Sequence, residues 1–363
     1  MPPSGMLSRR QASTALLGFP LLVAGLARTV PAAADPNDLP RIIVLATGGT
    51  IAGQASARTA IGYDAGKVTG ADLVAAVPGI DKLARISAEQ ISSIGSQDMN
   101  DTVWFDLVHR ITDIFAKDQA DGVVITHGTD TAEETAFFLN ATLPAGKPVV
   151  LVGSMRPSTA TGADGPANLY EAIEVAASPQ SAGRGVLVVL NDTIHYARWV
   201  QKTNTTSVET FQSANAGPAG YVDPSSVRFV QPAPHALPPL HLPPAPPLPR
   251  VEIIYSHANM DAAPIDGAVA AGAKGLVLAG VGDGNTSKSA LDALAEAARK
   301  GVIVVRSTRV GTGFVNRNVE VDDDKLGFAV SLDLNPQKAR ILLQLLIANG
   351  ITDSRQVQAA FAL

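Results

Sequence analysis

A threonine placed directly after two glycines is a candidate for nucleophilic chemistry. The segment 47–50 reads TGGT and follows the apolar run 41–45 (RIIVL). Two adjacent glycines let a backbone approach a small ligand closely, and their N–H groups can stabilise an oxyanion beside the Thr50 hydroxyl. A phosphate-binding loop fits less well, because G-x-G-x-x-G and the lysine of a P-loop are both missing. These residues alone leave a structural turn and a catalytic loop equally open.

A second polar loop, residues 127–131 (HGTDT), follows the apolar run 122–126 (GVVIT). Thr129 offers another hydroxyl, and the carboxylate of Asp130 can hold a cationic group such as an α-ammonium. His127 suggests a catalytic triad, but no serine in a nucleophile elbow accompanies it, so a hydrogen-bonded structural histidine is favoured. The loop therefore offers a hydroxyl and a carboxylate side by side.

Two further segments supply groups for a charged ligand. Residues 95–98 (GSQD) present Ser96 and Gln97, neutral donors suited to a carboxylate. Lys202 lies in the segment 201–206 (QKTNTT). If it is buried, its amine can lower the pKa of a threonine hydroxyl or accept its proton, whereas on an exposed loop it is merely solvated.

The inventory of reactive groups favours nucleophilic hydrolysis of a small charged molecule, with no metal and no cofactor. The sequence contains no cysteine, and none of its 6 histidines has a metal-ligand spacing such as H-E-x-x-H. The net charge of -5 and the lack of a basic run argue against a nucleic-acid partner. Hydrophobic residues make up 46% and charged residues 17%, which is typical of a globular protein with a large core.

Alternating strands and helices are expected to position the polar loops. The predicted strands are 41–45, 122–126, 148–153 and 185–191, and the predicted helices are 101–116, 132–141 and 167–177. Thr131 and Glu134 have the spacing of a capping box at the start of the second helix. This alternation predicts an α/β domain with a mainly parallel sheet flanked by helices, whose ligands bind beyond the carboxyl ends of the strands.

A proline-rich segment, 231–250, predicts an extended linker between two domains, and a Pro-rich docking ligand is the sharper alternative. Strands at 251–255, 275–279 and 302–306 and a helix at 286–300 follow it. A last helix is marked by Asn335 as N-cap, Pro336 at the first position and Gly350 beyond its end. The chain of 363 residues is thus divided into a catalytic domain, 35–230, and a second α/β domain, 251–363.

The first 34 residues predict an export signal. Arg9 and Arg10 precede an apolar run, 14–27, whose 14 residues fall short of the roughly 20 that span a membrane, so a membrane anchor is disfavoured. An A-x-A cleavage site at 32–34 places the mature start at Asp35, in a periplasm or outside the cell. The paired arginines are typical of a twin-arginine signal, and the general export route stays open.

The sequence resembles the bacterial type II L-asparaginases from about residue 41 to the C-terminus. The segments that carry the resemblance are VLATGGTIAG (44–53), IGSQDMND (94–101), ITHGTDT (125–131), VGSMRPST (152–159), DGPANLYEA (164–172), KTNTTS (202–207) and LNPQKARILLQL (334–345). The resemblance implies a larger N-terminal α/β domain and a smaller, flavodoxin-like C-terminal one. It also implies a homotetramer with sites shared between two subunits.

The resemblance also implies roles for single residues. Thr50 corresponds to the family's primary nucleophile, and Tyr63, on the following loop, to the tyrosine that assists it. Gly49 lines the substrate site with its backbone, and Ser96 and Gln97 match the pair that binds the substrate's carboxylate and amino groups.

A second cluster and a contribution from a neighbouring subunit are implied as well. Thr129, Asp130 and Lys202 match the family's second catalytic group. Glu320 matches an acceptor from the smaller domain of a neighbouring subunit. Asn285 matches another neighbour contact and favours asparagine over glutamine as the substrate.

The implied reaction is acyl transfer. Thr50 attacks the side-chain amide of L-asparagine, Tyr63 polarised by Glu320 helps to remove its proton, and water then hydrolyses the ester. Which of Thr50 and Thr129 attacks first is open, and we favour Thr50. The segment 54–66 is expected to be a lid that excludes water. The alternatives are a dual glutaminase-asparaginase and, from another class, a periplasmic amino-acid binding protein.

Overall fold

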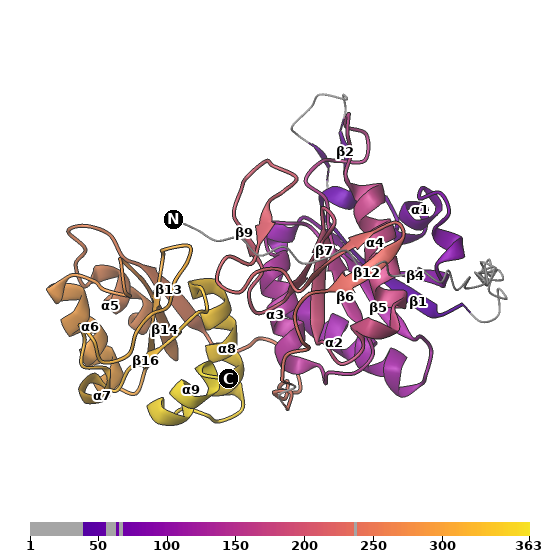
Figure 1. The fold of residues 1–363 in the computed structure, drawn as a ribbon. Helices are drawn as coiled ribbons and strands as arrows, with labels where there is room; N and C mark the ends of the chain where they lie inside the picture. The colour runs from indigo at the N-terminus through magenta and orange to yellow at the C-terminus, as the bar shows by residue number, and fades with distance from the viewer. Residues whose placement is uncertain (1–38, 56–62, 65–67, 236–237) are drawn as a thin grey trace, which may run out of the picture. The chain divides into compact units, whose positions relative to one another are not determined.

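The computed structural model describes residues 39–55, 63–64, 68–235 and 238–363. The predicted export segment, 1–34, lies outside the described residues, as does most of the predicted lid. The described chain contains an 8-stranded and a 4-stranded sheet, each covered by helices (Figure 1). This arrangement confirms the predicted fold class of two α/β units, the larger one N-terminal.

The larger sheet has the strand order β12-β11-β8-β7-β6-β5-β1-β4. Its parallel strands are β1 (Arg41–Gly48), β4 (Arg85–Ile94), β5 (Gly122–Thr126), β6 (Val149–Val152) and β7 (Val186–Leu190). An antiparallel extension follows with β8 (Thr193–Tyr196), β11 (Gly220–Asp223) and β12 (Ser226–Phe229). Sequence analysis did not find β4, because this edge strand is half-buried and reads RISAEQISSI without an apolar run.

Helices cover both faces of this sheet. In β1, Ile43 and Leu45 share a core with α2 (Asp101–Ala116) and α3 (Ala132–Thr142). The alternate residues of β1, Ile42 and Val44, share a second core with α1 (Gly70–Ala75) and α4 (Gly165–Ala177). A strand buried on both faces needs apolar side chains at every position, which explains the continuous apolar runs in the sequence.

The smaller sheet is parallel throughout, in the sequential order β13-β14-β15-β16. Its strands are β13 (Val251–Tyr255), β14 (Gly275–Gly280), β15 (Ile303–Thr308) and β16 (Ala329–Val330), and its helices are α5 (Ala263–Ala270), α6 (Lys288–Arg299), α7 (Asp323–Leu326), α8 (Pro336–Ala348) and α9 (Ser354–Phe361). Helix α8 packs on β13, β14 and β15 and also contacts α3 of the larger unit. Its N-cap, Asn335, accepts a hydrogen bond from the Lys338 amide, as predicted.

One prediction of local structure is wrong. Helix α3 begins where expected, but Thr131 forms no capping box, because its side chain makes no cap hydrogen bond. The Thr131 hydroxyl donates instead to the carbonyl of Ser96 at 2.7 Å. A tertiary partner on the neighbouring loop has therefore replaced the local cap.

The described part of the proline-rich segment contains no helix or strand. It is tied to the larger unit by the amides of Leu240, which donates to Ala141, and Leu248, which donates to Asp101. Short two-stranded ribbons pair β2 (Gln54–Ala55) with β3 (Tyr63–Asp64) and β9 (Gln201–Lys202) with β10 (Phe211–Gln212). No helix in the described chain is long and apolar enough to cross a membrane.

Candidate active site

Three polar loops meet at the carboxyl edge of the larger sheet. Strand β1 lies between β4 and β5, and all three run parallel. The loops 47–50, 95–98 and 127–131 follow these strands, so they lie side by side. The positions of loops 47–50 and 127–131 can be predicted from the sequence. The loop 95–98 lies beside them because it follows β4, a strand that was not predicted.

The glycines of these loops permit contact between backbones. Gly49 has a φ of +78°, and a Cβ on it would lie 2.3 Å from the amide nitrogen of Gly128. A Cβ on Gly128 would in turn lie 2.5 Å from the hydroxyl oxygen of Ser96. Real Cβ atoms essentially never come this close, so a Cβ at Gly49 would force the backbone of Gly128 to shift and one at Gly128 would displace Ser96. The glycines thus have a packing role that holds the hydroxyls of Thr50 and Ser96 close to the Thr129 loop.

Thr50 is the first residue of a short 3-10 helix, Thr50–Ala52, and its side chain is buried. Ser96 is also buried, and its hydroxyl accepts a hydrogen bond from the Asp130 amide at 3.2 Å. Gln97 is exposed, and its side-chain amide lies over Gly95, where an added Cβ would meet it at 2.4 Å. The predicted carboxylate-binding pair is therefore beside the Thr129 loop, with Gln97 on the solvent side.

Lys202 joins the second threonine from a distant part of the chain. Its ammonium donates to the Thr129 hydroxyl at 3.0 Å and to the Asp130 carboxylate at 2.6 Å. The lysine side chain is 16% exposed, whereas that of Asp130 is 59% exposed. An ammonium that donates to a hydroxyl oxygen stabilises negative charge developing on it, and the open carboxylate can take a second cation.

His127 is part of a buried hydrogen-bond chain. The Trp104 indole donates to the Thr135 hydroxyl at 2.8 Å, and this hydroxyl lies 2.9 Å from His127 Nε2. His127 Nδ1 lies 2.7 Å from the carbonyl of Gly128. An indole can only donate and a carbonyl can only accept, so the chain assigns the proton of a neutral imidazole to Nδ1. Burial lowers the pKa of His127 to about 4, and the ring has a structural role as expected.

Asn285 and Glu320 contact each other in the smaller unit, where the Asn285 amide donates to the Glu320 carboxylate. In the part of the chain that the structure describes, no hydrogen bond or ion pair joins either of them to Lys202. Their role in a neighbouring subunit therefore stays a prediction. Tyr63 lies in β3, and its side chain is outside the described residues, so its role also stays a prediction.

The loop beside Asn285 is held by a buried ion pair that was not predicted from the sequence. Arg306, in the middle of an apolar strand, is 1% exposed and forms two hydrogen bonds, of 2.6 and 2.8 Å, with Asp323. It also donates to the carbonyls of Gly284 and Asn316 at 3.2 and 3.1 Å, which fixes the loop next to Asn285. A charged residue inside an apolar strand was the signal that could have revealed it.

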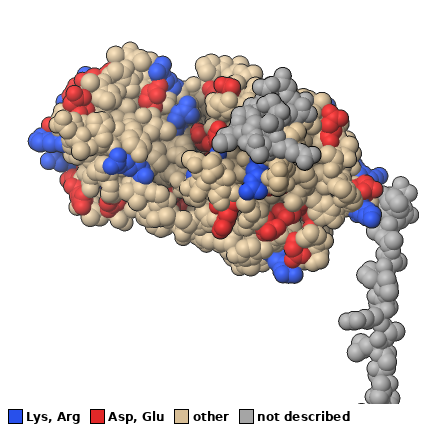
Figure 2. All heavy atoms as spheres, turned by 90° about the horizontal axis from the view of Figure 1, so that it is seen from above, with Lys and Arg blue, Asp and Glu red and all other residues tan. Residues whose placement is uncertain are grey.

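The described residues contain no group of three histidine or acidic side chains that could hold a metal ion. Figure 2 shows basic and acidic side chains interspersed over one face of the molecule, with no continuous basic stripe on that face. The arrangement at the sheet edge can bind a small zwitterion through the carboxylate of Asp130 and the donors of Ser96 and Gln97, next to two hydroxyls.

Known families and proteins match both units of the chain. Residues 41–235 match the family model Asparaginase, N-terminal, and residues 250–361 match the Glutaminase/Asparaginase C-terminal domain. The chain is 51% identical over 327 residues to L-asparaginase 2 of Escherichia coli (strain K12), covering 89% of this chain and 93% of that protein. It is 48% identical over 331 residues to a probable periplasmic L-asparaginase of Haemophilus influenzae, covering 90% and 94%.

The chain is also similar to a protein whose name includes glutaminase activity. The chain is 42% identical over 328 residues to a glutaminase-asparaginase of Pseudomonas fluorescens biotype A, covering 89% of this chain and 90% of that protein. Together the two family models cover both α/β units, and the three alignments each cover 89% or 90% of this chain. The chain therefore belongs to the asparaginase family.

Proposed function

We propose that this chain hydrolyses L-asparagine to L-aspartate and ammonia through an acyl-enzyme formed on a threonine. The observation that carries the proposal is the contact of Lys202 with Thr129 and Asp130, on a loop packed against the loop of Thr50. Two hydroxyls, a lysine and an open carboxylate can supply the nucleophile, its activation and the binding of an α-ammonium for amide hydrolysis of an amino acid.

In the proposed reaction the Thr50 hydroxyl oxygen attacks the side-chain amide carbon of asparagine. Its proton leaves through Tyr63, which Glu320 of a second copy polarises, and the oxyanion is stabilised by donors of the Thr129 loop. That proton passes on to the amide nitrogen, the C–N bond breaks, ammonia departs, and water hydrolyses the β-aspartyl ester to free aspartate and Thr50. Lys202 supports this chemistry because its ammonium donates to the Thr129 oxygen, which polarises the Thr129 O–H bond and strengthens it as a donor to the oxyanion.

The proposed binding of the substrate pairs each of its charged groups with a complementary group of the site. Asp130 is exposed and carries one cation already, Lys202, so a substrate α-ammonium can approach its free side. Ser96 and Gln97 donate to the α-carboxylate. Asn285 supports asparagine as the preferred substrate, and the glutaminase-asparaginase relative supports a dual activity as the second candidate.

Ammonia release from asparagine and from glutamine tests the proposed function. We expect turnover of asparagine with a kcat/KM well above that for glutamine. Comparable kcat/KM values for both substrates identify the dual enzyme. Stoichiometric binding of asparagine without any ammonia release identifies an amino-acid binding protein and removes the enzymatic proposal.

Shared sites are tested by mixing inactive variants. Thr50→Val removes the nucleophile, and Glu320→Ala removes the group from the neighbouring copy. If subunits share sites in a homotetramer, hybrids of the two variants regain part of the wild-type turnover, because some sites receive an intact residue from each parent. Verified hybrids that stay inactive contradict sharing.

We also propose that residues 1–34 direct export and are removed. Support comes from their signal-like sequence and from the relative named as a probable periplasmic protein. The mature protein from a periplasmic or culture fraction is expected to begin at Asp35. N-terminal sequencing checks this, and an intact Met1 in that fraction contradicts it.

A further inference from the structure

A buried ion pair joins the start of α3 to the start of α8. Lys338 is 2% exposed, and its ammonium lies 3.7 Å from the carboxylate of Glu133, which is also buried. Asn335 and Gln337 each donate to the same carboxylate at 3.0 Å. Glu133 therefore lies at the N-terminal ends of two helices, where the backbone dipoles stabilise its negative charge.

The same ammonium reaches the segment that leads to Lys202. Lys338 donates to the carbonyl of Arg198 at 3.0 Å and to that of Val200. Val200 is two residues before Lys202, and Glu133 is three residues after Asp130. One buried cation thus contacts both elements whose side chains meet in the Thr129–Asp130–Lys202 cluster.

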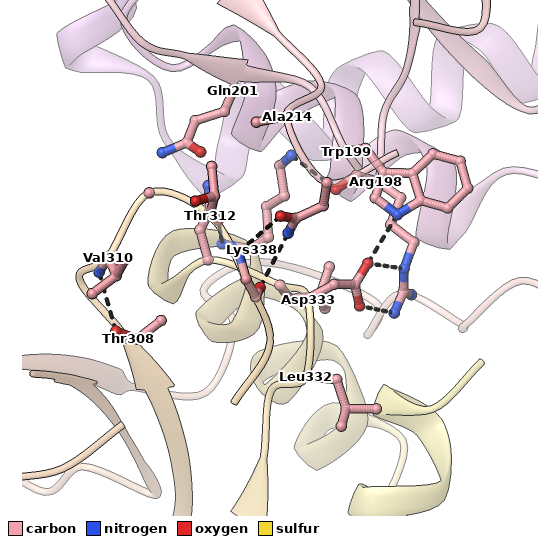
Figure 3. A pocket seen from close by; sticks show the side chains of 15 residues that line it. Arg198, Trp199, Gln201, Ala214, Thr308, Val310, Thr312, Leu332, Asp333 and Lys338 are labelled. Atoms are coloured by element: carbon pink, nitrogen blue, oxygen red, sulfur yellow. Dashed lines mark hydrogen bonds and ion pairs between the residues drawn. The ribbon is translucent and has the colours of Figure 1, made fainter. Parts of the chain in front are cut away.

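A second contact from the smaller unit fixes this segment further. Asp333 accepts hydrogen bonds from Arg198 at 2.7 and 2.9 Å and from the Trp199 indole at 2.9 Å. Figure 3 shows Asp333 facing Arg198 and Trp199, with Lys338 beside them. The segment before Lys202 is therefore held by the side chains of Lys338 and Asp333 rather than by a regular sheet, since β9 has only two residues.

We infer that Lys338 is a positioning residue for the proposed reaction, because it sets the distance between the strand of Lys202 and the loop of Thr129. This inference rests on the proposed function of that cluster. Lys338 lies on α8, in the smaller unit, and touches none of the reacting groups itself. The smaller unit thereby shapes a site that lies on the larger one.

A small displacement of the Lys202 segment is enough to disrupt the hydrogen bonds of Lys202. Lys202 donates to Thr129 at 3.0 Å and to Asp130 at 2.6 Å, so a displacement of about 1 Å breaks one of these hydrogen bonds. Misplacement of that size far from the chemistry can lower turnover by about a hundredfold. Burial lowers the pKa of Lys338 to about 8, so at neutral pH the group remains mostly an ammonium that can donate to both carbonyls.

The test compares Lys338→Met with Arg340→Met in the full-length chain. Methionine keeps the length of the side chain and removes the ammonium. Arg340 is on the same helix and donates to the carbonyl of Val251 at 3.1 Å, which does not lead to the site. Turnover is expressed per folded chain, with the folded fraction taken from the thermal unfolding curve at the assay temperature.

We expect Lys338→Met to lower kcat by about tenfold to a hundredfold, with a smaller change in KM for asparagine, because Ser96 and Gln97 keep their places and only Asp130, of the substrate-binding groups, belongs to the displaced cluster. Arg340→Met is expected to keep the wild-type kcat. A kcat per folded chain that is equal in the two variants overturns the inference. If Lys338→Met does not fold, Glu133→Gln removes the ion pair that links Lys338 to the Thr129 loop, and an unchanged kcat per folded chain then overturns the inference.

Hydrogen exchange gives a readout that does not depend on turnover. Lys338→Met is expected to raise exchange in residues 127–133 and 198–204 together, whereas Arg340→Met leaves both segments unchanged. This measurement stands even if the wild-type chain turns over neither asparagine nor glutamine, which would refute the proposed function instead. Unchanged exchange in both segments removes the positioning role.

Discussion

The loops of Thr50 and Thr129 share one edge of the sheet but are held by different forces. On the Thr50 side, the backbone of Gly49 packs directly against that of Gly128. Around Thr129 the contacts are between charged and polar side chains, and Lys202 comes from 73 residues further along the chain. The Thr50 side is therefore sensitive to volume, whereas the Thr129 side is sensitive to charge and to the assembly of distant segments.

The largest expected effect is on the Thr50 side. Thr50→Val removes the hydroxyl at nearly constant volume, so the fold is expected to persist while turnover falls at least about a thousandfold. Thr129→Val is expected to lose less, because the first attack is assigned to Thr50. Ammonia release by the two variants, with circular dichroism as the folding control, measures the difference. A larger loss in Thr129→Val reverses the assigned order.

Volume sensitivity is tested by adding one methyl group. Gly49→Ala is expected to destabilise the protein by about 3 kcal/mol, from the left-handed backbone and from the overlap with Gly128. Gly79 is a matched control: its φ is +76°, and a Cβ there would meet nothing within 4 Å. Gly79→Ala is expected to cost only about 1 kcal/mol. Equal losses in denaturant unfolding contradict close backbone packing at Gly49.

Charge sensitivity is tested at Lys202. Lys202→Met is expected to lower kcat by about a hundredfold, because the Thr129 hydroxyl then loses the ammonium that polarises it as a donor to the oxyanion. Stability is expected to change by less than about 1 kcal/mol, since the ion pair with Asp130 is open to solvent on the carboxylate side. Steady-state kinetics and denaturant unfolding of one preparation separate the two effects. A loss of stability without a loss of kcat contradicts the catalytic role.

The difference between the loops also explains what the sequence could predict. Apolar runs such as 122–126 identify buried strands, and polar segments at their ends identify the loops that carry Thr50 and Thr129. These signals are local. The edge strand β4 was missed because it is half-buried, and with it the adjacency of Ser96 to the other two loops.

Long-range contacts could not be read from local patterns. The sequence shows a lysine on an apolar helix at position 338 but not its partner Glu133, which is more than 200 residues away in the chain. The capping box at Thr131 failed for the same reason, because the hydroxyl found a tertiary acceptor on Ser96. Resemblance to a family supplied the roles of Lys202 and Glu320, and local patterns alone did not.

The smallest expected effect is a difference in how the two loops make the free energy of unfolding depend on pH. Residues 47–53 contain no titratable side chain, whereas the Thr129 loop begins at His127, whose pKa burial lowers to about 4. The unfolded chain binds a proton on this histidine near pH 6.5 and the folded chain does not, so stability is present above pH 6.5 and is lost as the pH falls toward 4. At pH 5 one such histidine lowers the free energy of unfolding by about 2 kcal/mol relative to pH 7.

His127→Asn removes this proton linkage, and asparagine can still donate to the Gly128 carbonyl. We expect the variant to be less stable than the wild type at pH 7, because the Thr135 hydroxyl loses its acceptor, but to lose about 2 kcal/mol less on acidification to pH 5. His257→Asn, at an exposed position, is expected to keep the wild-type pH dependence. Urea unfolding at both pH values measures the slopes. If His127→Asn and the wild type fall by the same amount, the buried neutral histidine does not couple the Thr129 loop to pH.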